Sequence, residues 1–207
     1  MPQQPLPNDF DRGILYAFLI TFAPKSTRIM NTIYFAGGCF WGTQHYLKQI
    51  RGVIATEAGY ANGRGEHPSY EEVYTDTTGF AECVRVVYDP AQVSLRFLTE
   101  LYFRSIDPTS LNRQGGDCGT RYRTGIYYTE PADEATLRAV CDRVAAQVGA
   151  PLAVELEPLR NFYPAEERHQ DYLDKNPGGY CHLPLALMEE ARRAREEHAT
   201  GKTAGEA

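Results

Sequence analysis

The amino-acid sequence predicts an α+β fold, in which helices pack on a mostly antiparallel sheet. Strand-like runs alternate between apolar and polar residues, whereas helical runs carry an apolar stripe. The two kinds of run mix without the strict β-α-β order of a parallel sheet. The 207 residues suit one domain with tails, and 43% hydrophobic with 12% aromatic residues is typical of a globular protein.

Five strands are expected where β-branched and aromatic residues cluster. The clearest covers residues 81–88 and is closed by Asp89-Pro90. The others cover residues 32–35, 53–60, 123–129 and 152–156.

Four helices are expected. The first covers residues 43–50 and is ended by Gly52. Ser94 caps the second, whose buried face carries Leu98, Leu101, Tyr102 and Ser105. The third covers 131–148, where Gly149 stops it, and the fourth is a charged helix over 188–198. The apolar stripe of the third helix comprises Leu137, Val140, Cys141, Val144 and Val148.

The chain is expected to hold one domain with two tails. Residues 1–29 are irregular and rich in proline, so we interpret them as an N-terminal extension. Residues 30–187 form the predicted catalytic domain, and 188–207 a charged helix with a frayed tail. The longest apolar run, at 13–23, is too short to span a bilayer. Asp9 and Asp11 stand before this run, where a signal peptide carries positive charge. We therefore expect a cytoplasmic protein without membrane attachment.

The charge balance excludes a broad basic surface. The formal net charge is −6, from 21 Lys and Arg against 27 Asp and Glu. Nucleic acid is therefore not an expected partner.

The five cysteines form neither a zinc motif nor a secreted disulfide framework, so no metal site is expected. They are sparse and odd in number, and none forms C-x-x-C. A buried, inert thiol is the default interpretation of each. They are Cys39, Cys83, Cys118, Cys141 and Cys181.

Cys39 is the strongest candidate for a reactive thiol. It lies in Gly37-Gly38-Cys39-Phe40-Trp41-Gly42, between a strand and a helix. A helix start stabilises an anion, which predicts a lowered thiol pKa. Phe40 and Trp41 could supply an apolar pocket or simply belong to the core.

Glu82 is the strongest candidate for an acid. It shares a strand face with Val84, Val86 and Tyr88. A carboxyl on an apolar face loses water, so its pKa rises and it can donate a proton near neutral pH. The alternative is that Glu82, close to the strand start, reaches solvent.

Five segments in order resemble the A-type peptide methionine sulfoxide reductases. The resemblance covers about residues 31–185, and several motifs in register are more specific than any one alone. The segments are Gly37-Gly38-Cys39-Phe40-Trp41-Gly42, Pro68-Ser69-Tyr70-Glu71-Glu72-Val73, Thr78-Gly79-Phe80-Ala81-Glu82, residues 114–124 around Asp117 and Tyr122, and residues 169–182 from His169 to Cys181-His182.

The resemblance implies a two-layer, ferredoxin-like α+β sandwich and a role for each matching residue. Cys39 would be the nucleophile and Glu82 the acid that protonates the sulfoxide oxygen. Tyr70 and Tyr122 would hydrogen-bond that oxygen, with Asp117 in the same polar shell. Phe40 and Trp41 would hold the substrate methyl group, and Cys181 would be the resolving cysteine.

The implied activity is reduction of methionine S-sulfoxide, free or in oxidised proteins, as a repair reaction. Cys39 would become a sulfenic acid and then a disulfide with Cys181, which a thioredoxin-type reductant would reopen. No cofactor is expected, and we expect a monomer.

Two positions depart from the family pattern, and two other functions remain open. Phe80 replaces a frequent histidine, and Cys118 follows Asp117 where cysteine is unusual.

A cysteine hydrolase pairing Cys39 with His169 or His182 is one alternative. A peptide-binding module built on Phe40 and Trp41 is the other.

Overall fold

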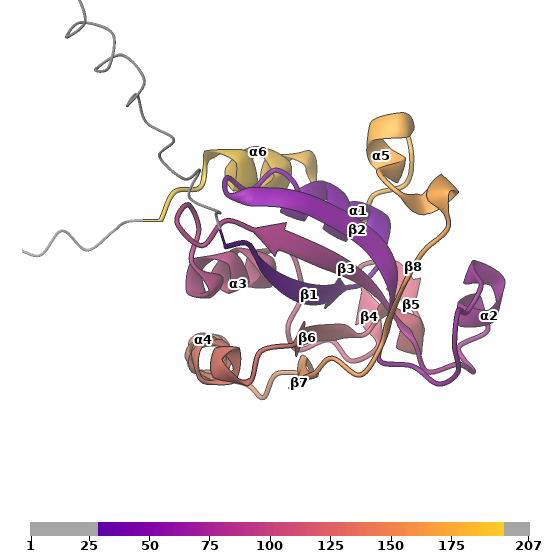
Figure 1. Ribbon diagram of the computed structural model, residues 1–207, viewed down its shortest axis with the longest axis horizontal. Coiled ribbons are helices and arrows are strands. Elements are labelled where there is room, and N and C mark those ends of the chain that lie inside the picture. Colours follow the sequence, from indigo (N-terminus) through magenta and orange to yellow (C-terminus); the bar gives the residue numbers. More distant parts are fainter. Residues whose placement is uncertain (1–28, 197–207) are drawn as a thin grey trace, which may run out of the picture.

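A computed structural model of the protein describes residues 29–196 (Figure 1). Most of the predicted N-terminal extension and the predicted frayed tail lie outside these residues. The centre of the molecule is a six-stranded sheet in the order β7-β6-β1-β3-β2-β8. A second, two-stranded sheet pairs β4 with β5.

The sheet has a ferredoxin-like centre. The chain runs β1-α1-β2-β3-α3-β6, with α2 inserted between β2 and β3. The neighbours in β6-β1-β3-β2 all pair antiparallel, whereas the edge strand β7 pairs parallel with β6. The predicted α+β class with a mostly antiparallel sheet is therefore confirmed. The strands are β1 (Asn31–Gly37), β2 (Val53–Ala61), β3 (Ala81–Tyr88), β4 (Arg113–Gln114), β5 (Asp117–Cys118), β6 (Thr124–Tyr128), β7 (Glu155–Pro158) and β8 (Phe162–Pro164).

The helices are α1 (Phe40–Leu47), α2 (Tyr70–Tyr74), α3 (Leu95–Arg104), α4 (Glu134–Val148), α5 (Tyr172–Lys175) and α6 (Leu185–Arg193). Single 3-10 turns cover Thr120–Tyr122, Pro131–Asp133 and Glu167–His169. Helix α1 packs on β2 and β3, and α4 packs on α3. Figure 1 shows α2 and α5 at one end of the molecule and α3 and α4 at the other.

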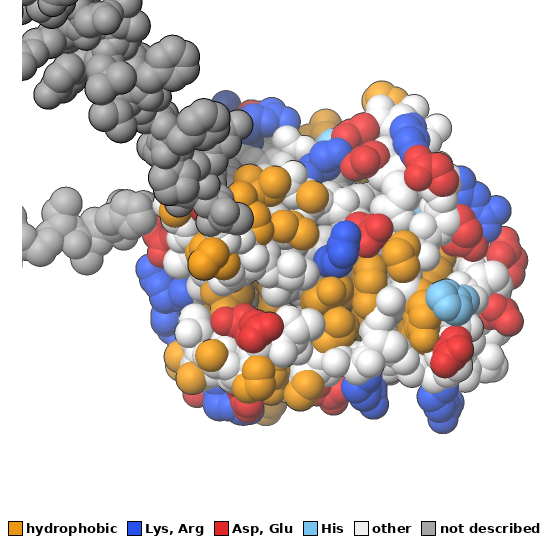
Figure 2. Space-filling view, viewed as in Figure 1, with side chains coloured by type: hydrophobic (Ala, Val, Ile, Leu, Met, Phe, Trp, Pro, Cys, Tyr) orange, Lys and Arg blue, Asp and Glu red, His pale blue; other side chains and the backbone are white. Residues whose placement is uncertain are grey.

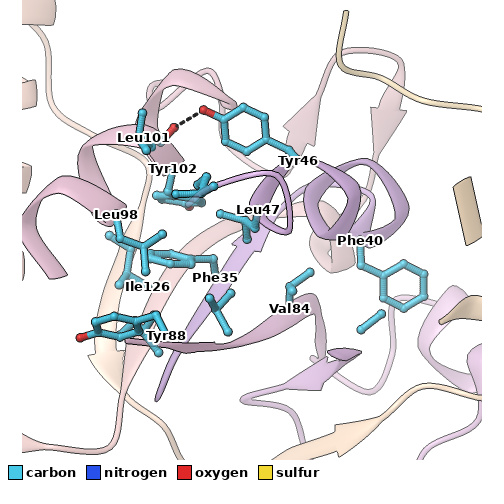
Figure 3. Close-up of a cluster of buried hydrophobic side chains, with 14 of the residues drawn as sticks. Phe35, Phe40, Tyr46, Leu47, Val84, Tyr88, Leu98, Leu101, Tyr102 and Ile126 are labelled. Atoms are coloured by element: carbon cyan, nitrogen blue, oxygen red, sulfur yellow. Dashed lines mark hydrogen bonds between the residues drawn. The ribbon is translucent and has the colours of Figure 1, made fainter. Parts of the chain in front are cut away.

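The main core lies between the sheet and the helices α1, α3 and α6 (Figure 3). Phe35 of β1 stacks on Tyr102 of α3, with 4.6 Å between ring centroids. The buried hydroxyl of Tyr46 donates to the carbonyl oxygen of Leu101 at 2.9 Å. The first contact fixes α3 against β1 and the second fixes α1 against α3, so both helices are held on the sheet. A smaller buried cluster contains Tyr34, Ala36, Ala61, Ala81, Cys83 and Tyr127.

Several predicted elements have different limits in the structure. Helix α1 begins at Phe40, directly after Cys39, rather than at residue 43. Val148 is exposed at the last turn of α4, although the stripe predicted it to be buried. The segment after residue 156, predicted without regular elements, contains β8, a 3-10 turn and α5. Strand β8 forms because it pairs with residues 59–61 of β2, far away in the sequence.

The last described helix belongs to the folded unit. Helix α6 begins at Leu185 and ends at Arg193, whereas the sequence predicted 188–198. Met188 and Ala191 are buried in the main core. Glu196 accepts hydrogen bonds from the backbone N–H and the hydroxyl of Ser94, at 2.9 and 2.6 Å. The boundary predicted after residue 187 therefore falls inside a packed helix.

The described surface carries both signs of charge. On the face in Figure 2, basic and acidic side chains are interspersed around apolar patches. Within residues 29–196, no helix is long and apolar enough to cross a membrane.

Candidate active site

Cys39 lies where β1 turns into α1. Gly38 makes this turn with a φ of +82°, which glycine adopts at little cost, and Cys39 is the N-cap residue of α1. Its carbonyl oxygen accepts the first helical hydrogen bond, from the backbone N–H of Thr43 at 3.3 Å. The Thr43 hydroxyl also donates to the carbonyl oxygens of Gly37 and Cys39, both at 3.1 Å. Thr43 thus holds the backbone in place before and after Gly38, in the turn that carries the thiol.

The pKa of Cys39 is shifted upward, whereas the sequence predicted a downward shift. Burial, with only 6% of the residue exposed, raises the pKa well above its usual value, and nearby Glu82 adds to the rise. The backbone N–H groups of Trp41 and Gly42 act in the predicted, lowering direction, but they are outweighed. Cys39 is therefore a protonated thiol in the resting protein.

Glu82 is a buried carboxyl next to Cys39. It is 2% exposed, and its Oε2 accepts a hydrogen bond of 2.9 Å from the backbone N–H of Phe40. Burial raises its pKa to about 8, although the Phe40 N–H and the Arg121 guanidinium act against the rise. The predicted burial and raised pKa are both confirmed. Glu82 can therefore hold a proton at neutral pH.

Tyr70, Tyr122 and Asp117 surround the same pair from three different segments. Burial raises the pKa of Tyr70 to about 12, and Glu82 and Cys39 contribute to the rise. The same two groups raise the pKa of Tyr122 in addition to burial. Asp117 raises the pKa values of both Cys39 and Glu82. The structure thus brings the predicted polar residues to one place.

Phe40 and Trp41 belong to an aromatic cluster that the sequence did not reveal. Trp41 stacks on Tyr172 with 3.8 Å between centroids, and its indole N–H donates to Nδ1 of His169 at 3.2 Å. The His169 ring lies 5.4 Å from the Phe40 ring and 4.5 Å from the Tyr70 ring. His169 lies in a segment that carried the family resemblance, but the sequence suggested a role for it only in the alternative cysteine hydrolase.

Two further residues hold the tyrosines in place. Glu166 accepts hydrogen bonds of 2.9 Å from the hydroxyl of Tyr60 and from the backbone N–H of Tyr70. Arg121 lies over the rings of Tyr74 and Tyr122, at 4.2 and 4.3 Å from their centroids. The contacts of Glu166 with Tyr60 and Tyr70, and of Arg121 with Tyr74, join positions far apart in the sequence, so no local pattern could have shown them.

Cys181 lies against the first turn of α1. A Cβ atom added to Gly42 would lie 3.3 Å from its Sγ atom. All five cysteines are free thiols. Cys118 is exposed on β5, Cys83 is fully buried in the smaller cluster, and Cys141 is partly buried against the main core.

Phe80 is buried directly before β3, two positions ahead of Glu82 in the sequence. Its ring fills the space next to Gly63, where an added Cβ atom would lie 2.1 Å from the ring. It also meets Tyr163 edge to face, with 5.9 Å between centroids. This departure from the family pattern places an apolar, buried side chain directly before β3.

Comparisons with known proteins agree with the resemblance seen in the sequence. The profile of the peptide methionine sulfoxide reductase family matches residues 31–200. The reductase MsrA of Clostridium acetobutylicum is 51% identical over 159 residues, which are 77% of this chain and 98% of that protein.

Solved structures agree with the sequence comparison. The reduced form of Mxr1 from Saccharomyces cerevisiae is 40% identical, with a TM-score of 0.72 over 75% of this chain and 91% of that one. Mxr1 in complex with Trx2 is 29% identical, with a TM-score of 0.50 over 69% and 84% of the chains.

The chain therefore belongs to the peptide methionine sulfoxide reductase family, and within it to the A-type enzymes. It is an oxidoreductase that reduces methionine sulfoxide.

Proposed function

We propose that this enzyme reduces the S epimer of methionine sulfoxide, free or within proteins, with Cys39 as nucleophile and Glu82 as acid. The observation that carries the proposal is the buried Glu82 carboxyl, hydrogen-bonded to the residue after Cys39, with a pKa of about 8. A carboxyl that keeps its proton at neutral pH can donate it to the sulfoxide oxygen. The biological role is repair of oxidised methionine in cytoplasmic proteins.

The first step transfers oxygen from the substrate to Cys39. Oε2 of Glu82 is engaged with the Phe40 N–H, so Oε1 is the atom that carries the proton. Glu82 gives this proton to the sulfoxide oxygen and takes up the proton of the Cys39 thiol as the Cys39 sulfur attacks the substrate sulfur. The hydroxyl then moves from the substrate sulfur to the Cys39 sulfur, and the sulfur–sulfur bond of the adduct breaks. Methionine leaves, and Cys39 keeps the oxygen as a sulfenic acid. The substrate sulfur is reduced, the cysteine sulfur is oxidised, and no net proton is consumed.

Hydroxyl donors stabilise the charge that develops on the oxygen. Tyr70 and Tyr122 have raised pKa values and therefore remain protonated donors. Donors fixed in a dehydrated site cost little reorganisation during the reaction. Asp117 completes this polar shell, while Phe40 and Trp41 hold the apolar methyl group of the substrate.

The second step forms a disulfide between Cys39 and Cys181. The Cys181 sulfur attacks the sulfenic acid sulfur, the S–O bond breaks, and water leaves with the thiol proton. The contact of Cys181 with the first turn of α1 supports this pairing. The two thiols supply the two electrons that reduce the sulfoxide, so these steps require no metal or organic cofactor.

A thioredoxin-type protein reopens the disulfide. The yeast relative Mxr1 is known in complex with Trx2, which supports a partner of this kind. We propose that this enzyme acts as a monomer.

A single-turnover experiment tests the proposal. Reduced enzyme is mixed with the S or the R epimer of methionine sulfoxide, without a recycling reductant. The S epimer should yield about one equivalent of methionine and the loss of two thiols, mapped by mass spectrometry to Cys39 and Cys181. Equal reaction of both epimers would contradict the proposed specificity, and a disulfide between other cysteines would contradict the pairing.

A further inference from the structure

His182, the residue after Cys181, has a buried ring with few hydrogen-bond partners. Its Nδ1 and Nε2 atoms are both buried, and apart from an interaction with the backbone of Gly37 neither has a hydrogen-bond partner. A buried polar atom without a partner costs about 1–3 kcal/mol, so its presence calls for an explanation. The mechanism described above does not use this ring.

The ring lies beside Cys181 and beside the two glycines on either side of Cys39 in the chain. The space next to Gly42 is filled by His182 and Cys181, whereas the space next to Gly38 is filled mainly by Gln114, with His182 slightly farther away. A Cβ atom added to Gly42 would lie 3.0 Å from Nδ1 and from Cε1 of His182, and 3.3 Å from Sγ of Cys181. A Cβ atom added to Gly38 would lie 3.6 Å from Nε2 of the same ring.

The second step of the reaction needs a group that moves a proton. Burial raises the pKa of Cys181, so at neutral pH this residue is a thiol, whereas the attacking species is a thiolate. The hydroxyl group leaving Cys39 needs a proton to depart as water. A neutral imidazole can accept the first proton and deliver it to the second site.

We propose that His182 is a catalytic residue of the disulfide-forming step, in addition to the residues of the proposed function on which this inference rests. His182 accepts the proton of the Cys181 thiol as its sulfur attacks the sulfur of the Cys39 sulfenic acid. It then gives that proton to the departing hydroxyl. The S–S bond forms, the S–O bond breaks, and the imidazole returns to its neutral form.

The surroundings keep the ring neutral. Burial lowers the pKa of His182, while Asp117 on β5 and the backbone of Gly37 on β1 act in the opposite direction. The thiol of the neighbouring Cys181 is uncharged at neutral pH because its pKa is raised. The base form of His182 is therefore the resting form.

The test separates the two steps of a single turnover. Methionine release reports the first step, and the loss of free thiols after it reports the second. In His182→Gln, which keeps a polar side chain but cannot relay a proton in this way, the second step should slow by about 10²-fold or more. Cys39 sulfenic acid should then accumulate, detectable by trapping with dimedone. His67→Gln, on the exposed loop before α2, is the matched control and should form the disulfide at the wild-type rate.

Two further readouts exclude a purely structural role. Wild-type disulfide formation should fall at acidic pH as His182 becomes protonated, and this dependence should be absent in His182→Gln. Added imidazole should speed the second step in His182→Ala by occupying the space left by the ring. Disulfide formation within threefold of wild type in His182→Gln, or a slow step with unchanged pH dependence and no rescue, would overturn the inference. Failure of wild-type enzyme to release methionine would instead overturn the proposed function.

Discussion

A carboxyl and a thiol share the least hydrated part of the site, and each changes the proton affinity of the other. Glu82 raises the pKa of Cys39, and burial raises the pKa values of both. The Glu82 and Cys39 pair therefore stores two protons and carries no negative charge of its own. A sulfoxide, whose oxygen carries partial negative charge, enters a site where a proton donor is already present.

Replacing the acid should greatly lower the rate of the first step. In Glu82→Gln the rate of methionine release should fall by about 10²–10⁴-fold, because the amide cannot give up a proton. In the wild type this rate should decline above about pH 8, where Glu82 loses its proton. Cys83→Ala, on the opposite face of β3, is the matched control and should keep a near-normal rate. A loss of less than tenfold in Glu82→Gln would refute the assignment.

The same substitution should stabilise the fold at alkaline pH. The raised pKa means that the folded chain holds a proton between about pH 4.5 and 8 that the unfolded chain has released. From this group alone, the free energy of unfolding falls by up to about 1.4 kcal/mol per pH unit as pH rises through that window. The stability of Glu82→Gln relative to wild type should therefore increase from pH 5 to pH 8 and level off above it. Urea unfolding at several pH values measures this, and a constant difference would contradict it.

Cys118 and Cys181 should behave differently when each is replaced by serine. Cys181→Ser should still release about one equivalent of methionine and then stall with thioredoxin as reductant. Cys118→Ser should turn over nearly normally, because Cys118 is exposed on β5. Steady-state turnover with a thioredoxin system, and the size of the burst, distinguish these outcomes. Free cycling of Cys181→Ser together with stalling of Cys118→Ser would reverse the assignment.

Among the elements, the short helix α2 carries Tyr70 and depends on its cap. The hydroxyl of Ser69 accepts from the backbone N–H of Glu72 at 3.2 Å, and the Glu72 carboxylate accepts from the backbone N–H of Ser69 at 2.8 Å. This reciprocal capping box offsets the weak cooperativity of a helix of only five residues. The position of the Tyr70 hydroxyl is therefore set at the helix N-terminus.

Loss of this cap should affect substrate binding as well as stability. Ser69→Ala should lower the free energy of unfolding by about 1 kcal/mol and raise the KM for the sulfoxide. Ser94→Ala removes the cap of α3 and should cost at least as much stability, since Ser94 also bonds Glu196, but it should leave the KM unchanged. Urea unfolding and steady-state kinetics measure both effects. Equal changes in KM for the two variants would contradict a specific link between the cap and the site.

Local patterns predicted the elements that depend on local physics. The limits of β3, the Ser94 cap and the left-handed Gly149 that ends α4 all match the sequence prediction. Strand β8 was missed because it exists only through its pairing with β2. Strand alternation placed Glu82 on an apolar face, but it left open whether the side chain is buried or reaches solvent; the structure shows that it is buried.

Other parts of the site depend on contacts that no local pattern shows. The helix start at Cys39 was predicted, but the burial that outweighs its effect on the thiol pKa comes from several distant segments. The contact of Trp41 with His169 spans 128 positions of the sequence, and it was missed for the same reason.

At the scale of the whole molecule, β1 is the first strand and α6 the last helix of the residues that the structure describes. Met188 and Ala191 bury apolar side chains in the core, whereas β1 starts at Asn31, immediately after Met30. The two ends of the chain should therefore tolerate deletion differently.

Deletion of residues 1–29 should be tolerated, whereas deletion after residue 187 should not. A variant that begins at Met30 should fold and keep its reductase activity. A variant that ends at residue 187 loses Met188 and Ala191 from the core and should melt at a lower temperature or fail to accumulate as soluble protein. Thermal melting and activity assays check both. Loss of activity in the first variant would place the N-terminal segment within the functional domain.

The stack of Trp41 on Tyr172 gives the enzyme a built-in optical reporter. Trp41 is the sole tryptophan of the sequence, and its indole N–H is hydrogen-bonded to His169. Intrinsic tryptophan emission therefore originates only from this aromatic cluster, next to the proposed substrate pocket. Each change in hydration or hydrogen bonding there should alter its intensity or wavelength, so substrate entry and product departure can be followed in real time without a dye.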